Sequence, residues 1–366
     1  MTPEQANDRD GQTLWVFPKY SRNGASSRLR IYQFLPILEG AGFDPTVSPL
    51  FDDAYLERLY AKQKTSAFSV LKYYLRRARA LLSIKRGDVV LVQGELFPWL
   101  PSFVEAFFLR DTRLILDFDD AIFHRYDLNK LWLIRLVLGR KIDKLMRTSK
   151  LVVAGNRYLG DRAERAGAAK VEWLPTVVDI DRYSTVTSPE ASAPVVIGWI
   201  GTPITWASYG EALFQSISDA LADENVEFLV VGASKTEGKF GRIEFSPWTE
   251  YTEAQSIARM SVGLMPLDDS PWARGKCGYK LIQYLACGVP VIASPVGANL
   301  DIVEEGINGF FAESTADWAE AVAHFTQTPE SRREMGTRGR EMVRNNYSIQ
   351  RQGPRLVQMI QEVFDH

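Results

Sequence analysis

Short apolar runs alternate with amphipathic stretches along the chain. In the first half the runs are LWVFP from Leu14, DVVLVQG from Asp88, RLILDFD from Arg113, KLVVAGN from Lys150 and KVEWLPT from Lys170. Successive positions in these runs are apolar, so both faces of each strand would be buried, and the stretches between them have helical periodicity. The pattern predicts parallel strands covered by helices on both sides, the doubly wound α/β arrangement.

The pattern restarts after Pro189 with the runs PVVIGWIG, VEFLVVGA, RIEFSPW, VGLMPL, PVIASP and GFFA. The segment STVTSPEASAP from Ser184 has the composition of a linker. We therefore expect two Rossmann-like domains, at residues 1–183 and 195–345, joined by a linker at 184–194. Residues 346–366 are expected to form a C-terminal helix that packs back toward the first domain.

Composition and charge narrow the class of protein. With 46% hydrophobic and 24% charged residues, the chain of 366 residues has globular composition. Its longest apolar stretch, FPWLPSFVEAFFL from Phe97, is too short to span a bilayer, and the N-terminal sequence lacks the apolar stretch of a signal peptide. We expect a cytoplasmic protein.

The net charge of −2 conceals an asymmetry between the halves. Residues 1–182 hold 29 Lys and Arg against 22 Asp and Glu, hence +7, whereas residues 183–366 hold 14 against 23, hence −9. Such a split indicates that one half meets a polyanion or an anionic membrane, and uneven surface charge without a partner is the alternative.

The sequence GKCGYKLIQYLACG at 275–288 predicts a glycine-bounded loop followed by a short helix, with Gly288 as its C-terminal cap. A helix N-terminus attracts anions, and the cations Arg274, Lys276 and Lys280 lie beside it. The pattern favours a diphosphate site that includes Gly278 and Tyr279, and a solvated basic loop is the alternative. Cys277 and Cys287 fall at opposite ends of the helix, so we expect free thiols and no metal site.

The segment from Ser270 to Phe311 resembles the nucleotide-sugar segment of family-4 glycosyltransferases, which have the GT-B fold. The sequences SRNGASSRLRIYQFLPILEGAGFD, VVAGNRYLGDRA and VEWLPTVVDIDRY are similar to that family's first glycine loop and to its last elements before the domain crossover. The resemblance implies two Rossmann-like domains facing each other across a cleft. It also implies transfer of a sugar from a nucleotide-diphosphate sugar to a saccharide or lipid-linked saccharide, in surface polysaccharide or glycolipid synthesis.

The sequence departs from the family at several positions. The two glutamates that this family usually carries in the loop and helix are Gly275 and Gln283 here, and the Gln283 amide can still bind ribose hydroxyls. The Arg and Lys expected after the first strand of the second domain are absent from GWIGTPITWASYG, which begins at Gly198. We expect that Arg274, Lys276 and Lys280 hold the diphosphate instead. Gly201, Thr202 and Thr205 would add N–H and hydroxyl donors, and decay into an inactive relative is the alternative.

Candidate catalytic residues follow a strand of the first half. Asp117 and Asp119 share one face of RLILDFDD, and Asp120 begins the loop. Many family members have a histidine where Asp119 falls, so Asp119 or Asp120 is the predicted catalytic carboxylate. A helix N-cap is the alternative for Asp120.

Other residues of the first half are weaker candidates. Gly24 fits the family's glycine loop, in which backbone N–H groups approach phosphate or acceptor. Arg28, Arg30, Glu95 and His124 are candidate acceptor contacts, although a surface helix explains the arginines and packing explains the histidine nearly as well.

Two basic and apolar helical stretches, residues 66–86 and 129–147, bear on membranes. In the first, Tyr73, Tyr74 and Leu75 lie beside Arg76, Arg77 and Arg79, which favours an interfacial contact on the inner face of the membrane. For the second, we prefer a helix packed on the sheet with a basic outer face. No aromatic stacking platform accompanies the basic residues, so nucleic acid is not an expected partner.

The sequence therefore predicts a glycosyltransferase of the hexosyltransferase type that needs neither cofactor nor metal. A nucleotide-sugar epimerase of the same fold and a non-catalytic binding subunit remain alternatives.

Overall fold

A computed structural model describes residues 12–61, 63–183, 194–221, 225–233 and 243–365. The chain forms two compact units. Unit 1 comprises Met1–Thr176 and Gly353–His366, and unit 2 comprises Val177–Gln352. The predicted linker, 184–194, lies outside the described residues except for its last position.

Unit 1 contains a parallel six-stranded sheet with the order β2-β1-β3-β4-β5-β6. Its strands are β1 (Gln12–Phe17), β2 (Phe43–Val47), β3 (Val89–Gln93), β4 (Arg113–Phe118), β5 (Leu151–Ala154) and β6 (Val171–Trp173). All the runs that were expected to form strands in this half do so, and β2 is an additional edge strand.

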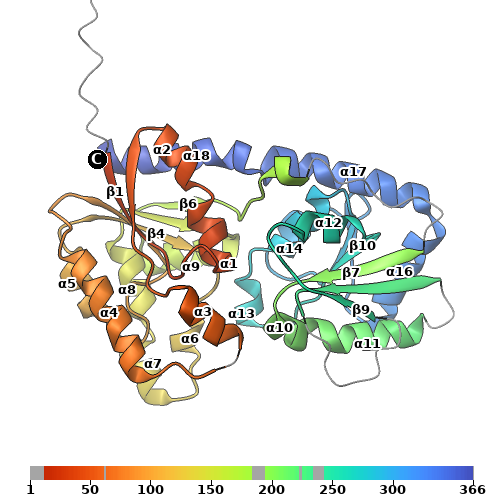
Figure 1. Cartoon of the computed structure of the whole chain (residues 1–366), viewed down its shortest axis with the longest axis horizontal. Coiled ribbons are helices and arrows are strands. Elements are labelled where there is room, and N and C mark those ends of the chain that lie inside the picture. Colours follow the sequence, from red (N-terminus) through yellow and green to blue (C-terminus); the bar gives the residue numbers. More distant parts are fainter. Residues whose placement is uncertain (1–11, 62, 184–193, 222–224, 234–242, 366) are drawn as a thin grey trace, which may run out of the picture. The chain divides into compact units, whose positions relative to one another are not determined.

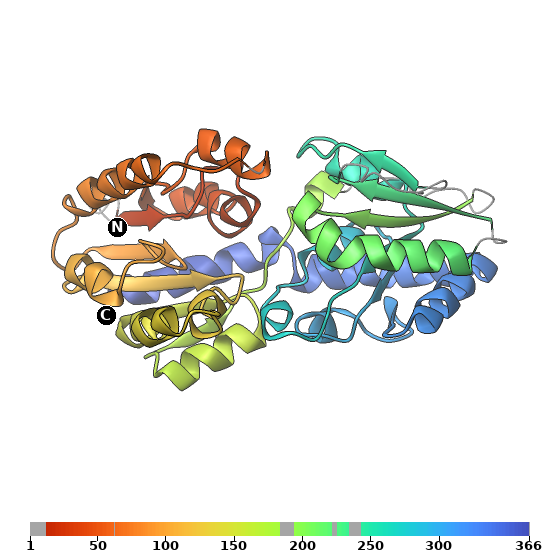
Figure 2. The same ribbon diagram turned by 90° about the horizontal axis from the view of Figure 1, so that it is seen from below.

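Helices lie on both sides of this sheet (Figures 1 and 2). They are α1 (Ala25–Ser27), α2 (Leu35–Gly40), α3 (Asp53–Tyr60), α4 (Ala67–Leu81), α5 (Ser102–Leu109), α6 (His124–Asp127), α7 (Trp132–Leu138), α8 (Lys141–Thr148) and α9 (Arg157–Ala166). A π-helical turn at Arg28–Tyr32 follows α1.

Unit 2 contains a second parallel six-stranded sheet, with the order β12-β11-β10-β7-β8-β9. Its strands are β7 (Val195–Ile200), β8 (Val226–Val231), β9 (Ile243–Ser246), β10 (Val262–Met265), β11 (Val291–Ala293) and β12 (Gly309–Phe311). Each corresponds to one of the six predicted runs. The predicted doubly wound α/β architecture is therefore confirmed in both units.

The helices of unit 2 are α10 (Pro203–Thr205), α11 (Glu211–Ala220), α12 (Glu253–Ala258), α13 (Pro271–Arg274), α14 (Tyr279–Ala286), α15 (Asn299–Ile302), α16 (Thr315–Gln327) and α17 (Pro329–Asn346). A 3₁₀ turn at Ile180–Tyr183 precedes β7, and a π-helical turn at Trp206–Gly210 joins α10 to α11.

The central strands of unit 2 are apolar at nearly every position because the sheet has a core on each face. On β8, Phe228 and Val230 belong to the cluster that includes residues of α11 and α16. The alternate residues Leu229 and Val231 belong to the cluster that includes residues of α12 and α14. Side chains alternate between the faces of a strand, so burial on both faces requires an unbroken apolar run.

The last helix, α18 (Ile349–Asp365), returns the chain to unit 1. The Phe364 ring lies 5.3 Å from that of Phe43, and Lys170 pairs with Glu362 at 2.6 Å. Gly353 faces Ile37 so closely that an added Cβ would lie 2.6 Å from the Ile37 Cδ1 atom. The glycine thus permits close packing of the C-terminal segment on α2.

None of the helices within the described residues is long and apolar enough to cross a membrane.

Candidate functional site

Each sheet has a point at which the strand order reverses. In unit 1, β1 lies between β2 and β3, and in unit 2, β7 lies between β8 and β10. Loops that leave the carboxyl ends of the strands diverge at such a point and form the usual ligand crevice of doubly wound sheets. The predicted site residues follow β1, β3 and β4 in unit 1, and β7 and β10 in unit 2.

In unit 2, local chemistry fixes the turn before α14. Ser270 caps α13 by accepting the Ala273 N–H at 3.2 Å. Gly278 has a φ of +64°, and an added Cβ would lie 2.4 Å from the Ile302 Cδ1 atom. Only glycine meets both conditions without strain. Gly288 ends the helix with a φ of +75°, so the predicted glycine cap is confirmed.

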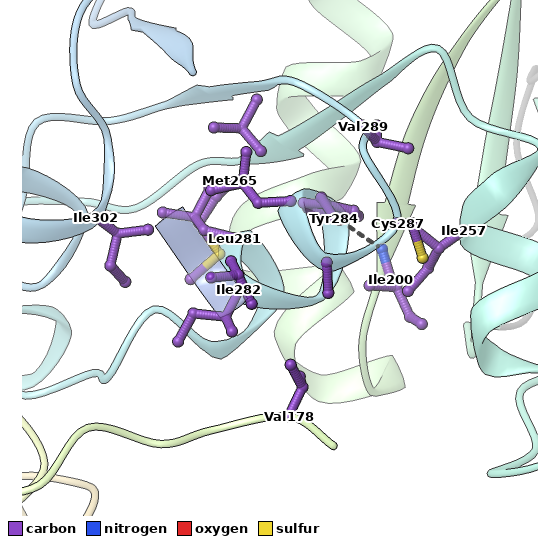
Figure 3. Close-up of a cluster of buried hydrophobic side chains, with 14 of the residues drawn as sticks. Val178, Ile200, Ile257, Met265, Leu281, Ile282, Tyr284, Cys287, Val289 and Ile302 are labelled. Carbon is purple, nitrogen blue, oxygen red and sulfur yellow. Dashed lines mark hydrogen bonds between the residues drawn. The ribbon is translucent and has the colours of Figure 1, made fainter. Parts of the chain in front are cut away.

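Helix α14 is tied to both strands of the crevice by Tyr284, which is fully buried. The Tyr284 hydroxyl accepts the Ile200 N–H at 3.0 Å and donates to the Leu264 carbonyl at 3.3 Å. Figure 3 shows Tyr284 within the apolar cluster together with its bond to Ile200. Ile200 ends β7 and Leu264 lies in β10, so Tyr284 holds α14 against the two strands at the reversal point.

Lys280 provides a cation at this point. Its ammonium group lies 4.2 Å from the centroid of the Trp199 ring. An added Cβ at Gly201 would lie 2.6 Å from Trp199 and 2.9 Å from the Lys280 Cε atom, so the glycine leaves room for the lysine chain. Within the described residues, Lys280 has no carboxylate partner.

Burial, followed by the positive charge of Lys276, lowers the pKa of Lys280 to about 7. The neighbours of this half-buried ammonium group are the face of Trp199 and a second cation, Lys276. Among the described residues it has no carboxylate, although buried charges normally have a partner of opposite charge. An anion bound there would supply it. Binding of an anion by Lys280 and Lys276 stays a prediction.

Arg274 is placed differently from the two lysines. It is exposed and forms a two-point ion pair with Asp269 at 2.6 and 2.7 Å. We had expected it to act as a third cation for the diphosphate, but Asp269 already balances its charge.

The residues after β7 also differ from expectation. Thr202 and Thr205 form a capping box in which each side chain receives the other's backbone N–H, at 3.1 and 3.3 Å. The Gly201 N–H donates to the Val231 carbonyl at 3.0 Å. All three N–H groups are thus engaged within unit 2, and their contact with a donor stays a prediction.

Two further residues of α14 were predicted site residues. Gln283 is 4% exposed, and its side chain makes no hydrogen bond within the described residues. Tyr279 begins the helix and packs against the buried cluster around Tyr284. Cys277 and Cys287 are free thiols, as predicted, and burial raises the pKa of the Cys287 thiol.

In unit 1, a hydrogen-bond network joins the ends of β1, β3 and β4. The buried Gln93 side chain accepts from the Lys19 N–H at 3.1 Å and from the Ser27 hydroxyl at 2.6 Å. It also donates to the Ser26 hydroxyl at 2.6 Å, and Ser26 in turn donates to Asp119. Asp119 is thereby oriented by two residues that sequence reasoning did not select, Gln93 and Ser26.

Gly24 precedes α1 and permits this arrangement of the loop. An added Cβ would lie 2.4 Å from the Cβ of Tyr20, so no other residue fits without moving the loop. Asp120 is half-buried like Asp119, and its carbonyl accepts the Ile122 N–H at 2.8 Å.

The predicted acceptor contacts Arg28 and Arg30 are buried rather than exposed on a surface helix. Arg30 pairs with Asp117 through contacts of 2.5 to 3.2 Å and donates to the Leu174 carbonyl at 2.8 Å. Burial raises the pKa of Asp117, and Arg30 opposes the shift. The expectation that Arg30 faces an acceptor is corrected, because its guanidinium group holds β4 to the end of β6.

Glu95 is likewise buried, at 3% exposure, and belongs to an ion-pair network. Lys141 lies 2.6 Å from Glu95 and 2.8 Å from Glu105, and the Tyr126 hydroxyl donates to Glu95 at 2.7 Å. Burial raises the pKa of Glu105. The network holds the loop after β3, so the expectation that Glu95 meets the acceptor is corrected.

His124 has both ring nitrogens engaged, with Asp127 at 2.8 Å and with the Tyr158 hydroxyl at 2.8 Å. Its side chain is 8% exposed. It therefore packs α6 against α9, which agrees with packing as the alternative to acceptor binding.

Residues 194–328 match the family of group 1 glycosyl transferases. Over these residues the chain is similar to that family. The sequence resemblance to glycosyltransferases is thereby confirmed for unit 2. Among curated proteins, none has a sequence that matches the chain.

Solved structures show the fold of the whole chain. A glycosyltransferase from Rickettsia africae superposes with a TM-score of 0.72 at 14% identity over 98% of this chain and 100% of that one. Sucrose-phosphate synthase from Thermosynechococcus elongatus gives 0.71 at 13% identity over 97% and 99%. HepE of Anabaena in complex with UDP gives 0.69 at 15% identity over 96% and 100%. The predicted GT-B fold is confirmed.

Proposed function

We propose that the protein transfers a hexosyl group from a nucleotide-diphosphate sugar to a saccharide or lipid-linked saccharide acceptor. The observation that carries the proposal is Lys280, a half-buried cation that lacks a carboxylate partner among the described residues and lies at the crevice of unit 2. The HepE complexes with UDP and UDP-glucose support a donor of this class. Surface polysaccharide or glycolipid synthesis is the proposed context.

Lys280, Lys276 and the first N–H groups of α14 would bind the diphosphate, and Gln283 would bind the ribose. Negative charge grows on the diphosphate as the bond to the sugar breaks, so fixed cations stabilise the transition state more than the ground state. A dielectric constant of about 20 gives about 4 kcal/mol for one charge pair at 4 Å. The proposal therefore assigns charge neutralisation to the chain itself, with neither metal nor cofactor.

Asp119 is the proposed catalytic carboxylate of unit 1. Its carboxylate would accept the proton of the acceptor hydroxyl or stabilise positive character at the anomeric carbon. The hydrogen bonds through Ser26 and Gln93 fix its orientation, which favours Asp119 over Asp120. A nucleotide-sugar epimerase would not need an acceptor, and a binding subunit would not release nucleotide. Acceptor-dependent nucleotide release therefore distinguishes the three functions.

A thermal-shift screen of nucleotide sugars tests the donor site. Ligands that bind the folded state stabilise it by about 2.7 kcal/mol at one hundred times Kd. We expect at least one nucleotide-diphosphate sugar to raise the melting temperature by several degrees, with the free sugar as the inactive control. If UDP-, GDP-, ADP- and dTDP-sugars all leave the melting temperature unchanged, the proposed function is wrong.

We further propose that unit 1 contacts an anionic membrane surface. Apolar side chains on or beside α4, α5 and α7 are exposed, most of all Phe68 at 78%, Leu82 at 73%, and Phe103 and Leu136 at 71% each. The same class includes Leu71, Leu75, Trp99, Phe107, Leu131, Trp132, Leu133 and Val137. Exposed apolar surface of this extent indicates an interaction site.

Basic groups are also present on α4 and beside α7. Lys72, Arg76 and Arg79 are exposed on α4. A cavity of about 400 Å³ beside α7 is lined by four arginines, Arg135, Arg140, Arg162 and Arg165, and by two aspartates, Asp127 and Asp143. Apolar side chains with a basic surround are typical of interfacial contacts with anionic lipid.

The residues differ from those expected. Tyr73 and Arg77 are buried, and Arg77 donates to the Pro18 carbonyl at 2.8 Å. The stretch 129–147, for which we preferred a packed helix with a basic outer face, instead exposes apolar α7. The exposed apolar surface is therefore centred on α7 as much as on α4.

Vesicle co-sedimentation tests this contact. We expect binding to vesicles that contain anionic lipid, weaker binding at high salt, and loss of binding in the double variant Trp132→Ser, Leu136→Ser. Arg79→Gln with Arg140→Gln should reduce affinity about thirty-fold, since each basic residue contributes about 1 kcal/mol. Ile204→Ser and Arg333→Gln in unit 2 are matched controls. Equal binding to neutral vesicles, or none to either kind, would contradict the proposal.

A further inference from the structure

Lys19 lies at the crevice of unit 1, directly after β1. Its backbone N–H is held by Gln93, the last residue of β3. Its ammonium group lies 5.1 Å from the centroid of the neighbouring Tyr20 ring. The side chain is half-buried, and within the described residues it has neither an ion pair nor a hydrogen bond.

The electrostatic surroundings of Lys19 come from three other elements. Burial, then Arg125 of α6, lowers the pKa of Lys19 to about 8. Glu95 after β3, and Asp119 and Asp120 after β4, oppose this shift. Lys19 therefore lies among groups that leave three neighbouring strands, although none of these carboxylates is within ion-pair distance of it.

The other buried or half-buried cations around this crevice have partners. Arg30 is paired with Asp117, Lys141 with Glu95 and Glu105, and Arg125 with Glu95 at 3.4 Å. These pairs hold β4, α6 and α8 in place. Among the residues that the structure describes, Lys19 has no such partner, so support of the fold does not explain its charge.

We propose that Lys19 binds an anionic group, a phosphate or a carboxylate, on the acceptor. This inference rests on the proposed function, because it assumes that unit 1 receives the acceptor. Asp119 would meet the reacting hydroxyl while Lys19 meets the anion, so that one acceptor spans both. A charge-assisted hydrogen bond from the ammonium group to an oxyanion is stronger than one from a neutral donor. Lys19 would thereby distinguish charged saccharides from neutral ones.

The test is NMR of the full chain labelled with ¹³C-lysine, in which the Cε signal reports protonation. Lys19→Arg and Lys280→Arg identify the two signals by their disappearance, and the exposed Lys85, identified by Lys85→Arg, serves as the control. The protein is titrated with glucose 6-phosphate, glucuronate, glucose and UDP. At each ligand concentration, the pH midpoint of each lysine is measured.

We expect glucose 6-phosphate or glucuronate to raise the Lys19 midpoint by about one unit, which corresponds to an about ten-fold preference of the anion for the charged lysine. Glucose should leave it unchanged, and Lys85 should respond to none of the four. A response to glucose 6-phosphate alone identifies a phosphate-bearing acceptor, and a response to glucuronate alone identifies a carboxylate-bearing one.

Two results overturn the inference. In one, the Lys19 midpoint does not respond to any of the anions. In the other, it responds to UDP and not to the charged sugars, which would make Lys19 a donor contact. The Lys280 signal separates these failures from failure of the proposed function, since Lys280 should respond to UDP whether or not Lys19 binds an acceptor.

Discussion

Replacement of Asp119 by Asn is expected to lower turnover by about 10²- to 10⁴-fold, the range associated with loss of a general acid or base. Asn retains an oxygen that accepts the Ser26 hydroxyl, so the local geometry survives while the charge is lost. The carboxylate interaction strengthens in the transition state, and kcat should therefore fall far more than donor affinity. Nucleotide release with and without acceptor measures the effect.

Asp120→Asn is the matched control, since it removes a neighbouring half-buried carboxylate that is not part of the Gln93 and Ser26 network. Ser26→Ala should have an intermediate effect, because it removes the group that orients Asp119. If Asp119→Asn keeps near-normal turnover and Asp120→Asn does not, the assignment within the pair is reversed. If both keep it, the catalytic group lies elsewhere.

Lys141→Met is expected to destabilise unit 1 by about 3 to 5 kcal/mol, the usual cost of removing one partner from a buried ion pair. Lys141 is 1% exposed and neutralises two buried carboxylates, Glu95 and Glu105. Without the lysine, Glu105 must be buried without an ion-pair partner or take up a proton, and Glu95 keeps only its longer contact with Arg125 at 3.4 Å. Urea unfolding followed by fluorescence measures the loss.

The pH dependence of this loss has a definite sign. The pKa of Glu105 is already raised by burial, and loss of Lys141 would raise it further. At acid pH, Glu105 takes up a proton and the variant no longer buries its unpaired charge. The difference in free energy of unfolding between the wild type and the variant should therefore shrink as pH falls from 8 to 5. Lys144→Met, on the exposed side of the same helix, should change stability by less than about 0.5 kcal/mol. Equal stability of the two variants would contradict the assignment.

The sequence predicted the central strands well for a physical reason. A strand buried on both faces is apolar at nearly every position, as in β3, where only Gln93 is polar, and β8, where only Glu227 is polar. Such runs are visible without a structure. The edge strand β2 was not predicted, because it contains Pro45 and is half-exposed, with the mixed pattern FDPTV. Edge strands bury fewer side chains and therefore leave a weaker pattern.

The turn before α14 was predictable because its causes are local. Gly278 and Gly288 adopt left-handed conformations that the sequence marks directly. The partners of the charged residues were not predictable, because they come from distant parts of the chain. Lys280 lies against Trp199, Arg30 pairs with Asp117, and Glu95 pairs with Lys141. Such contacts turned two predicted substrate contacts, Arg30 and Glu95, into ion pairs within the protein. The third, Arg274, pairs locally with Asp269.

Lys19 and Gln93 were missed for a related reason. One follows an apolar run and the other ends one, positions that carry no motif. A general rule would have found them, since polar residues at the carboxyl ends of strands beside a reversal of strand order line the ligand crevice. The rule needs the order of the strands, which the sequence pattern did not provide.

Calorimetric titration with the nucleotide sugar that gives the largest thermal shift tests the central claim, that Lys280 binds the donor diphosphate. The anion requires the charged lysine, so wild-type affinity should fall as pH rises through about 7 toward 8.5. Lys280→Met should bind about ten- to a hundred-fold more weakly at pH 6.5 and lose this pH dependence.

Folding of the variant is not expected to suffer. The pKa of Lys280 is lower in the folded protein than in the unfolded chain, so protonation of this lysine disfavours folding. The free energy of unfolding therefore decreases as pH falls from the unfolded pKa to about 7. Methionine removes that penalty, so the melting temperature at pH 7 should not drop. Arg333→Met, which removes an exposed charge from α17, controls for net charge. Ten-fold or greater loss in Lys280→Met with an unchanged control supports the account, and equal affinity in both variants would contradict it.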